Sequence, residues 1–355
     1  MSLARDLKDI HMKISKWLTR LGLVFGSLMV VVSCATSNPT PNALSDVPVS
    51  VAGDPITLGY SNWIGWLPWA IAEEEDLFTA NGVNVELKWF ESALTSLEAM
   101  VAGQLDANSQ TLSETITFAP SARNGEVIVL VNDNSDGNDK IIVAEEVNSV
   151  ADLKGRQVAL EEGIVGDFLL SLALEEEGLS RDEITILNME TGAAAVAFAV
   201  GQVDAVAAWV PFTQTALKRN GSKELVSSKD FPGAIPDLLV MSQTLIDERP
   251  EQVQAIVNTW YDTLEFIASN PQKSYEIMAK RAGISANEIQ NFQSGVKMFT
   301  PQDNLEAFSS GNSMKHLNFA AQKIAKFITD IGFVQQIPST DGLFDKSFVR
   351  AYVAP

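Results

Sequence analysis

One short segment occurs twice in this chain, and its surroundings are repeated with it. Residues 100–107 read MVAGQLDA and residues 198–205 read FAVGQVDA, so their glycines lie 98 positions apart (201 − 103). Strand-like and helix-like patterns alternate ahead of both copies. They place strands at 56–60 and 83–89 with helices at 68–81 and 93–102, and then strands at 157–160 and 184–188 with helices at 165–177 and 193–200. This alternation predicts an α/β fold with two βαβαβ lobes, each holding a parallel sheet with right-handed crossovers.

After residue 230 the pattern changes from alternation to mostly helix. Residues 237–242 are expected to form a returning strand, and helical patterns follow at 250–268, 272–282, 286–294 and 314–331, separated by proline and glycine. We expect these C-terminal helices to cover the first lobe. The expected boundaries are 54–135 and 236–355 for lobe one and 136–235 for lobe two, with crossings near residues 133–140 and 230–237.

The first 33 residues have the pattern of a lipoprotein signal peptide. Basic residues precede an apolar run at 21–32 that is too short to span a bilayer, and the run ends in Val31-Val32-Ser33-Cys34. This ending resembles the bacterial lipobox, in which the cysteine is acylated and becomes the mature N-terminus. An uncleaved anchor is the alternative, and both place the body outside the cytoplasmic membrane. Residues 34–53 are polar, hold three prolines and are expected to be a lipid-anchored tether.

Composition excludes several classes of function. The chain has 45 acidic and 25 basic side chains, a net charge of −20, so it lacks the basic surface that nucleic-acid binding requires. With one cysteine and two histidines it cannot form an internal disulfide, nor a zinc site of four cysteines or of two cysteines and two histidines. The acidic segment 133–139 lacks the glutamate that closes a calcium loop. We therefore expect no metal and no cofactor.

The lipobox, the tether, the duplicated lobes and the segment Leu239–Pro250 (LVMSQTLIDERP) together resemble the substrate-binding proteins of ABC importers. The similarity is to the group that serves nitrate, taurine, aliphatic sulfonates and thiamine-pyrimidine precursors, over residues 54–335. It implies a type II periplasmic-binding-protein fold with a ligand cleft between the lobes, and a monomer that delivers its solute to a membrane permease. Some proteins of this fold are enzymes that make pyrimidine precursors, but that chemistry needs histidines, and the mature chain keeps only His316. A ligand-sensing domain is a third possibility.

Four loops are expected to converge on the cleft, because ligands of open α/β sheets bind beyond the carboxyl ends of the strands. These loops are 61–63, 109–111, 161–167 and 209–211. Together with the crossing segment, they supply the expected ligand-binding residues Asn62, Trp63, Trp66, Ser109, Gln110, Asp136, Glu162, Asp167 and Trp209.

Several conspicuous residues have a structural explanation instead. Trp69 continues the helical spacing of Trp63 and Trp66 and is expected in the core. Asp106 and Asp204 occupy matching places in the repeat, which favours a shared duty such as bonding a loop amide. Residues 132–139, rich in Asp, Asn and Gly, read as a turn at the hinge and the cleft floor.

The charge of the ligand is the remaining question. Glu161, Glu162 and Asp167 bracket the start of a helix, where an anion would otherwise be favoured, and no Lys or Arg occurs in residues 54–87, 105–122 or 157–180. Carboxylates accept paired N–H bonds and indole faces attract cations. The sequence therefore predicts a small, nitrogen-rich, cationic solute of the guanidinium kind. An anion such as nitrate, taurine or an alkanesulfonate is the alternative that the resemblance implies.

Overall fold

The computed structural model describes residues 53–354, which form two separate sheets. The first sheet has the strand order β11-β4-β10-β3-β1-β2, and the second has the order β7-β6-β8-β5-β9. The strands of the first sheet are β1 (Ile56–Ser61), β2 (Val85–Phe90), β3 (Ala107–Thr111), β4 (Val127–Ser135), β10 (Pro236–Met241) and β11 (Val296–Met298). Those of the second are β5 (Asp139–Val143), β6 (Gln157–Leu160), β7 (Thr185–Asn188), β8 (Ala205–Trp209) and β9 (Lys223–Ser227).

The two sheets repeat one arrangement of three parallel strands. In the first sheet β1 pairs in parallel with β2 and with β3, and in the second β6 pairs in parallel with β7 and with β8. The repeated segments end at β3 and β8, as the sequence predicts. The expected α/β fold with two βαβαβ lobes is confirmed, and we call the six-stranded sheet with its helices the first lobe and the five-stranded one the second lobe.

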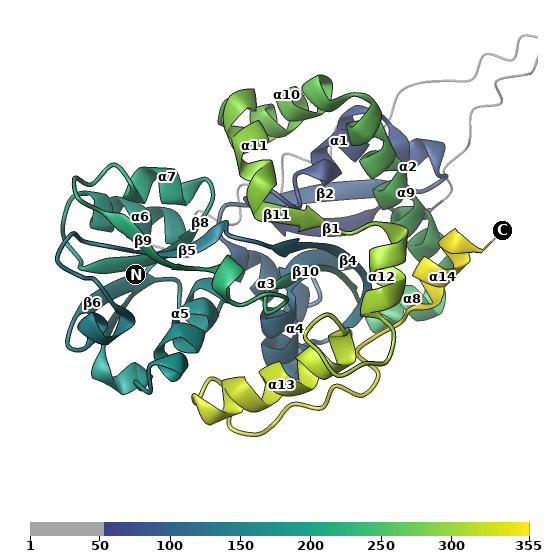
Figure 1. Cartoon of the computed structure of the whole chain (residues 1–355). Coiled ribbons are helices and arrows are strands. Elements are labelled where there is room, and N and C mark those ends of the chain that lie inside the picture. The colour runs from purple at the N-terminus through teal and green to yellow at the C-terminus, as the bar shows by residue number, and fades with distance from the viewer. Residues whose placement is uncertain (1–52, 355) are drawn as a thin grey trace, which may run out of the picture. The chain divides into compact units, whose positions relative to one another are not determined.

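Helices cover both faces of each sheet (Figure 1). They are α1 (Pro68–Glu74), α2 (Leu77–Ala80), α3 (Ala93–Val101), α4 (Leu112–Phe118), α5 (Val165–Glu176), α6 (Thr191–Ala199), α7 (Phe212–Ala216), α8 (Gln243–Glu248), α9 (Pro250–Ser269), α10 (Pro271–Ala282), α11 (Ala286–Phe292), α12 (Pro301–Ala307), α13 (Leu317–Asp330) and α14 (Ser347–Val353). The C-terminal helices α9 and α10 pack on α1, while α13 packs on α4 on the other side of the first sheet.

The chain passes between the lobes at two places that contact each other. The first crossing, between β4 and β5, is residues 136–138, and the second, between β9 and β10, is residues 228–235. Ser228 Oγ lies 2.7 Å from Ser135 Oγ and accepts the Gly137 N–H at the same distance, while the Ser135 N–H donates to the Ile235 carbonyl. Because these two segments are the only chain connections between the sheets within residues 53–354, a hinge motion would pass through this hydrogen-bonded pair.

Two local expectations differ from the structure. The helix expected at 68–81 divides into α1 and α2, because Asp76 adopts the left-handed conformation with φ 55°. The segment expected as a turn at 132–139 begins as strand: Asn132 and Asp133 are buried inside β4, and only residues 136–138 lie outside a strand. The expected signal peptide and the tether up to residue 52 lie outside the described residues.

Candidate functional site

The four loops at the carboxyl ends of β1, β3, β6 and β8 meet around one small cavity between the lobes. Each loop contributes at least one lining residue, which confirms the predicted convergence. The cavity is lined by Trp63, Trp66, Ala93, Thr111, Glu114, Asp139, Val165, Trp209, Ile235 and Asp237. Its volume of about 20 Å³ is enough for roughly one water molecule, so the lobes are in a closed arrangement.

Larger grooves occur elsewhere on the described part of the chain, but they have a different character. Those beside α13 measure about 540 and 490 Å³, and all their charged lining side chains are partly or fully exposed. Neither groove contains a residue of the four loops expected to bind the ligand, although the second includes Asn134 and Asp136 near the end of β4. We therefore take the small cavity, which we call the cleft, as the candidate site.

Indole rings form the apolar part of the cleft. Trp63 Nε1 donates to Asp133 Oδ1 at 3.1 Å, and Trp209 Nε1 of the second lobe donates to the Asn62 carbonyl of the first at 3.0 Å. The buried Trp66 Nε1 has no hydrogen-bond partner among the described residues, so it is a donor still open to a ligand. Trp69 is fully buried, stacks on neighbouring rings and donates to Ser109 Oγ at 3.0 Å, which confirms its expected place in the core.

Carboxyl groups form the polar part. Glu114, Asp139 and Asp237 line the cleft, each at most 3% exposed, and none of the ten lining residues is a lysine or an arginine. Asp133 lies behind them, directly opposite Asp237 in the pairing of β4 with β10. This is the feature of the cleft that most restricts what it can bind.

Burial makes these carboxyl groups hard to ionise. It raises the pKa of Asp139 to about 7 despite a hydrogen bond from Ser135, and it raises the pKa of Glu114. Burial also raises the pKa of Asp237 and Asp133, and for Asp237 the neighbouring Asp133 adds to the shift. A charged carboxylate without a cationic partner is costly in a buried site. A cation entering the cleft would remove that cost.

Direct hydrogen bonds join the lobes at the rim of the cleft. The Val165 N–H at the start of α5 donates to Glu114 Oε1 at 3.2 Å, across from α4 of the first lobe. Ser92, at the start of α3, donates to the Glu161 carboxylate, which also accepts from Thr191 Oγ1 at 3.1 Å. Together with the Trp209 to Asn62 bond, these contacts hold the closed arrangement.

Glu162 and Asp167 are engaged with a cation of the chain itself. Arg181 donates two hydrogen bonds to the buried Asp167, from Nε to Oδ1 at 3.0 Å and from Nη2 to Oδ2 at 2.7 Å. Its Nη2 also donates to Glu162 Oε1 at 2.8 Å. Neither carboxylate lines the cleft. The segment 157–180, which holds no Lys or Arg, ends one residue before Arg181. The prediction that Glu162 and Asp167 lack a cationic partner in the chain is therefore wrong.

The other expected ligand residues are placed as follows. Gln110 donates to Thr115 Oγ1 and Glu126 Oε2 inside the first lobe, and Ser109 is the buried partner of Trp69. Asp136 is exposed at the first crossing and lines a groove there. The backbone carbonyl of Asn62 accepts the hydrogen bond from Trp209 Nε1. Of the nine expected residues, Trp63, Trp66 and Trp209 line the cleft.

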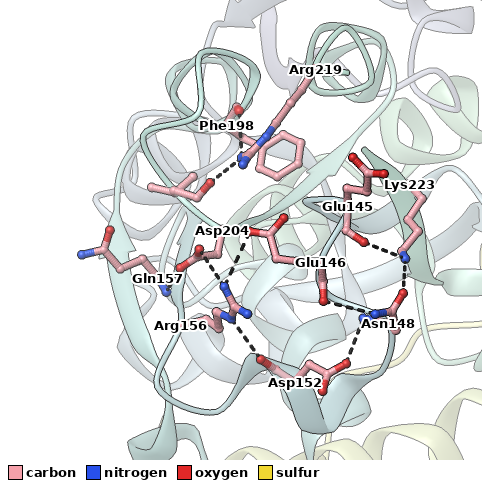
Figure 2. A network of polar contacts seen from close by, with 11 residues as sticks. Glu145, Glu146, Asn148, Asp152, Arg156, Gln157, Phe198, Asp204, Arg219 and Lys223 are labelled. Carbon is pink, nitrogen blue, oxygen red and sulfur yellow. Dashed lines mark hydrogen bonds and ion pairs between the residues drawn. The ribbon is translucent and has the colours of Figure 1, made fainter. Parts of the chain in front are cut away.

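The two repeat aspartates are structural, as predicted. Asp106 accepts the Thr57 N–H at 2.8 Å, and Asp204 accepts the Gln157 N–H at 2.9 Å, so each ties the repeat strand to the strand that begins its βαβαβ unit, β1 or β6. Figure 2 shows Asp204 within a wider network in which Arg156 contacts it, while Arg219 donates to carbonyl oxygens near Phe198. The basic side chains Arg156 and Arg219 therefore bond groups within the second lobe itself.

The sequence reasoning missed Glu114, Asp139 and Asp237 as lining residues. Two signals were present: Thr111 and Glu114 have the spacing of a capping box directly after the repeat strand, and Asp237 is a lone charge in an otherwise apolar strand. A charge inside an apolar strand is seldom tolerated without a function or a partner.

Comparison with known proteins gives one family and one fold. Residues 52–283, or 232 of 355, match the NMT1-like family. A protein of Brucella abortus (strain 2308) with a provisional binding-protein name is 26% identical over 292 residues, covering 80% of this chain and 90% of that protein.

Two solved structures share the fold at low identity. The periplasmic aliphatic sulphonate binding protein SsuA from Escherichia coli matches with a TM-score of 0.69 at 21% identity, covering 83% of this chain and 93% of that one. The desulfurization enzyme DSZB matches with a TM-score of 0.58 at 16% identity, covering 84% of this chain and 99% of that one. The same fold therefore serves binding and catalysis, and only the contents of the cleft can distinguish them.

Proposed function

Since this chain belongs to the NMT1-like family, we propose that it is the solute-binding component of an ABC importer and that its solute is a small cation of the guanidinium or alkylammonium kind. The solute enters between the open lobes, both lobes contact it, and the closed form docks on a membrane permease. Closure is populated in proportion to the difference in affinity of the solute for the two forms.

The observation that carries the sign of the charge is the lining of the cleft. Three buried carboxyl groups and three indoles face the site, and no lining side chain is basic. A planar cation would satisfy the carboxylates with charge-assisted hydrogen bonds and lie against the indole faces. An anion would be repelled by these groups wherever they are ionised, in a site that is screened from solvent.

An alkanesulfonate or a related anion is the second candidate, supported by the name of the structural relative SsuA. It is disfavoured here because Glu114 Oε1 already accepts the first amide of α5 and no lining side chain is basic. Catalysis is also disfavoured. No histidine, cysteine or lysine lines the cleft, and His316 lies by Ser309 and Glu306, outside it.

The protein is proposed to act outside the cytoplasmic membrane, anchored by lipid on Cys34. No helix within residues 53–354 is both long and apolar enough to cross a bilayer. Cys34 lies outside the described residues. Expression of Cys34→Ala with the signal intact, followed by fractionation, tests this: equal membrane retention of a cleaved product by both forms would contradict the anchor.

Native mass spectrometry of the chain from Ala35 onward, purified without added ligand, tests the solute. We expect a retained small basic compound. A thermal-shift panel then compares methylguanidine, guanidine and alkylamines with taurine, ethanesulfonate and nitrate. Asp237→Asn should abolish the stabilisation by cations, whereas Glu162→Gln, which removes a carboxylate outside the cleft, should not. Stabilisation by the sulfonates alone would contradict the proposal.

A further inference from the structure

Helix α5 begins without a side-chain cap of its own. Its N-cap residue is Ile164, whose side chain cannot accept a hydrogen bond, although α5 is twelve residues long and its first amides need acceptors. The backbone amide that Asp167 accepts from is that of Gly163, which lies ahead of the helix. The Val165 N–H, the first amide of α5, is left for a partner from elsewhere.

That partner is Glu114 of the first lobe. Its Oε1 accepts the Val165 N–H at 3.2 Å, and its Oε2 accepts the Thr111 N–H at 2.8 Å in the capping box of α4. The side chain is 1% exposed and lines the cleft. One carboxyl group thus caps its own helix and the first amide of a helix in the other lobe.

This position coincides with the place where an anionic solute would be held. A helix start offers free N–H groups and a positive partial charge, which is why anions bind there. In this chain the protein's own carboxylate already fills that role. The unpartnered Trp66 Nε1 and the carboxyl groups of Asp139 and Asp237 line the same cleft, so Glu114 acts within a site that still has polar groups to offer.

We propose that Glu114 is the residue that determines the charge preference of this cleft, by occupying the amide that an anion would need and by presenting a carboxylate to a cation. This inference rests on the proposed solute-binding function. It explains how a fold shared with a sulphonate-binding protein could take the opposite charge through a single side chain of the first lobe.

Glu114→Gln removes the charge of the side chain and keeps its length and shape. The amide oxygen can still accept from Val165 or Thr111, and glutamine is a normal partner in a capping box, so the helices should remain in place. The matched control is Glu126→Gln, a buried carboxyl group that bonds Gln110 in the first lobe and does not line the cleft. Both variants lose one buried carboxylate.

Isothermal titration calorimetry at pH 8 with methylguanidine and with ethanesulfonate gives the readout. The parent and Glu126→Gln should bind only methylguanidine. Glu114→Gln should bind it roughly 10- to 100-fold more weakly, as expected for the loss of a charged hydrogen-bond partner, and should gain detectable ethanesulfonate binding. A merely structural role would weaken methylguanidine binding without any gain of ethanesulfonate binding, which would overturn the inference.

Glu114→Asp gives a second, independent test should the glutamine variant fail to fold. The shorter side chain keeps its charge but cannot bridge both amides, so it should still prefer methylguanidine and still exclude ethanesulfonate. Ethanesulfonate binding by Glu114→Asp would show that charge is not the determinant. If the parent itself binds ethanesulfonate and not methylguanidine, the proposed function fails. If the parent binds methylguanidine and Glu114→Gln keeps the same preference, only the role of Glu114 fails.

Discussion

Affinity for a permanently charged cation should rise steeply between pH 6 and pH 8. Asp139 is 3% exposed at the junction of the crossing and β5, and burial raises its pKa to about 7. The charged groups that act on it are Glu114, which raises the pKa, and Lys140, which lowers it, while Asp133 and Asp237 lie nearby with raised pKa values of their own. A bound cation favours the ionised carboxylate, so acidification opposes binding.

The size of the effect follows from that pKa. If the solute binds only the ionised form, the apparent dissociation constant is multiplied by 1 + 10^(pKa − pH), which for a pKa of about 7 is roughly 11 at pH 6 and roughly 1.1 at pH 8. Ionisation of Asp139 alone should therefore raise the affinity about tenfold between pH 6 and pH 8, or by about 1.4 kcal/mol. The other lining carboxyl groups change in the same direction and can only add to it.

Calorimetry with methylguanidine at pH 6, 7 and 8 measures this, because the guanidinium charge does not change in that range. Titration in phosphate and in Bis-Tris propane, which both buffer in this range and differ in ionisation heat, counts the protons released on binding, which should be greater at pH 6 than at pH 8. Asp139→Asn should flatten the pH dependence by about tenfold. An affinity that is independent of pH, or that rises toward pH 6, would refute the reasoning.

Three further predictions concern stability and packing. Burial raises the pKa of Glu126 to about 7, so between about pH 4.5 and 7 the folded state holds a proton that the unfolded chain has released. The free energy of unfolding should therefore fall as pH rises through this range, and urea unfolding of Glu126→Gln should lack that fall. Arg181→Met leaves the buried Asp167 without its cation and should lower the free energy of unfolding by roughly 2–3 kcal/mol at pH 8, with methylguanidine affinity nearly unchanged; a loss of binding without a loss of stability would contradict the pairing. Gly65→Ala would place a Cβ 2.0 Å from Asp133 Oδ2, so it should cost about 1–3 kcal/mol of stability and weaken binding, and wild-type values in both assays would contradict this close approach.

Local pattern was enough to predict the repeated halves of the fold. Strand β6 has the predicted bounds, 157–160, because its apolar residues are bracketed by clear helix and turn signals. Asp106 and Asp204 could be identified as structural because each serves its own lobe, and the repeat makes the same contact visible twice.

The contents of the cleft depend on contacts that no local pattern records. Glu114 has the signature of a capping-box residue, and only the approach of α5 from the second lobe gives it a further role. Asp167 lies in the first turn of α5, whereas Arg181 follows the last turn of the same helix in sequence. Only the folded chain brings the two side chains together. Asp133 and Asp237 lie 104 positions apart (237 − 133) and become neighbours because β4 and β10 pair across the crossing.

A paired titration of the unmodified mature protein at pH 8 decides whether this cleft selects a cation. Methylguanidine and ethanesulfonate are titrated separately into ligand-free protein in the same buffer. We expect saturable heat with one-to-one stoichiometry for methylguanidine and no saturable heat for ethanesulfonate. Saturable binding of ethanesulfonate, with methylguanidine silent, would contradict it.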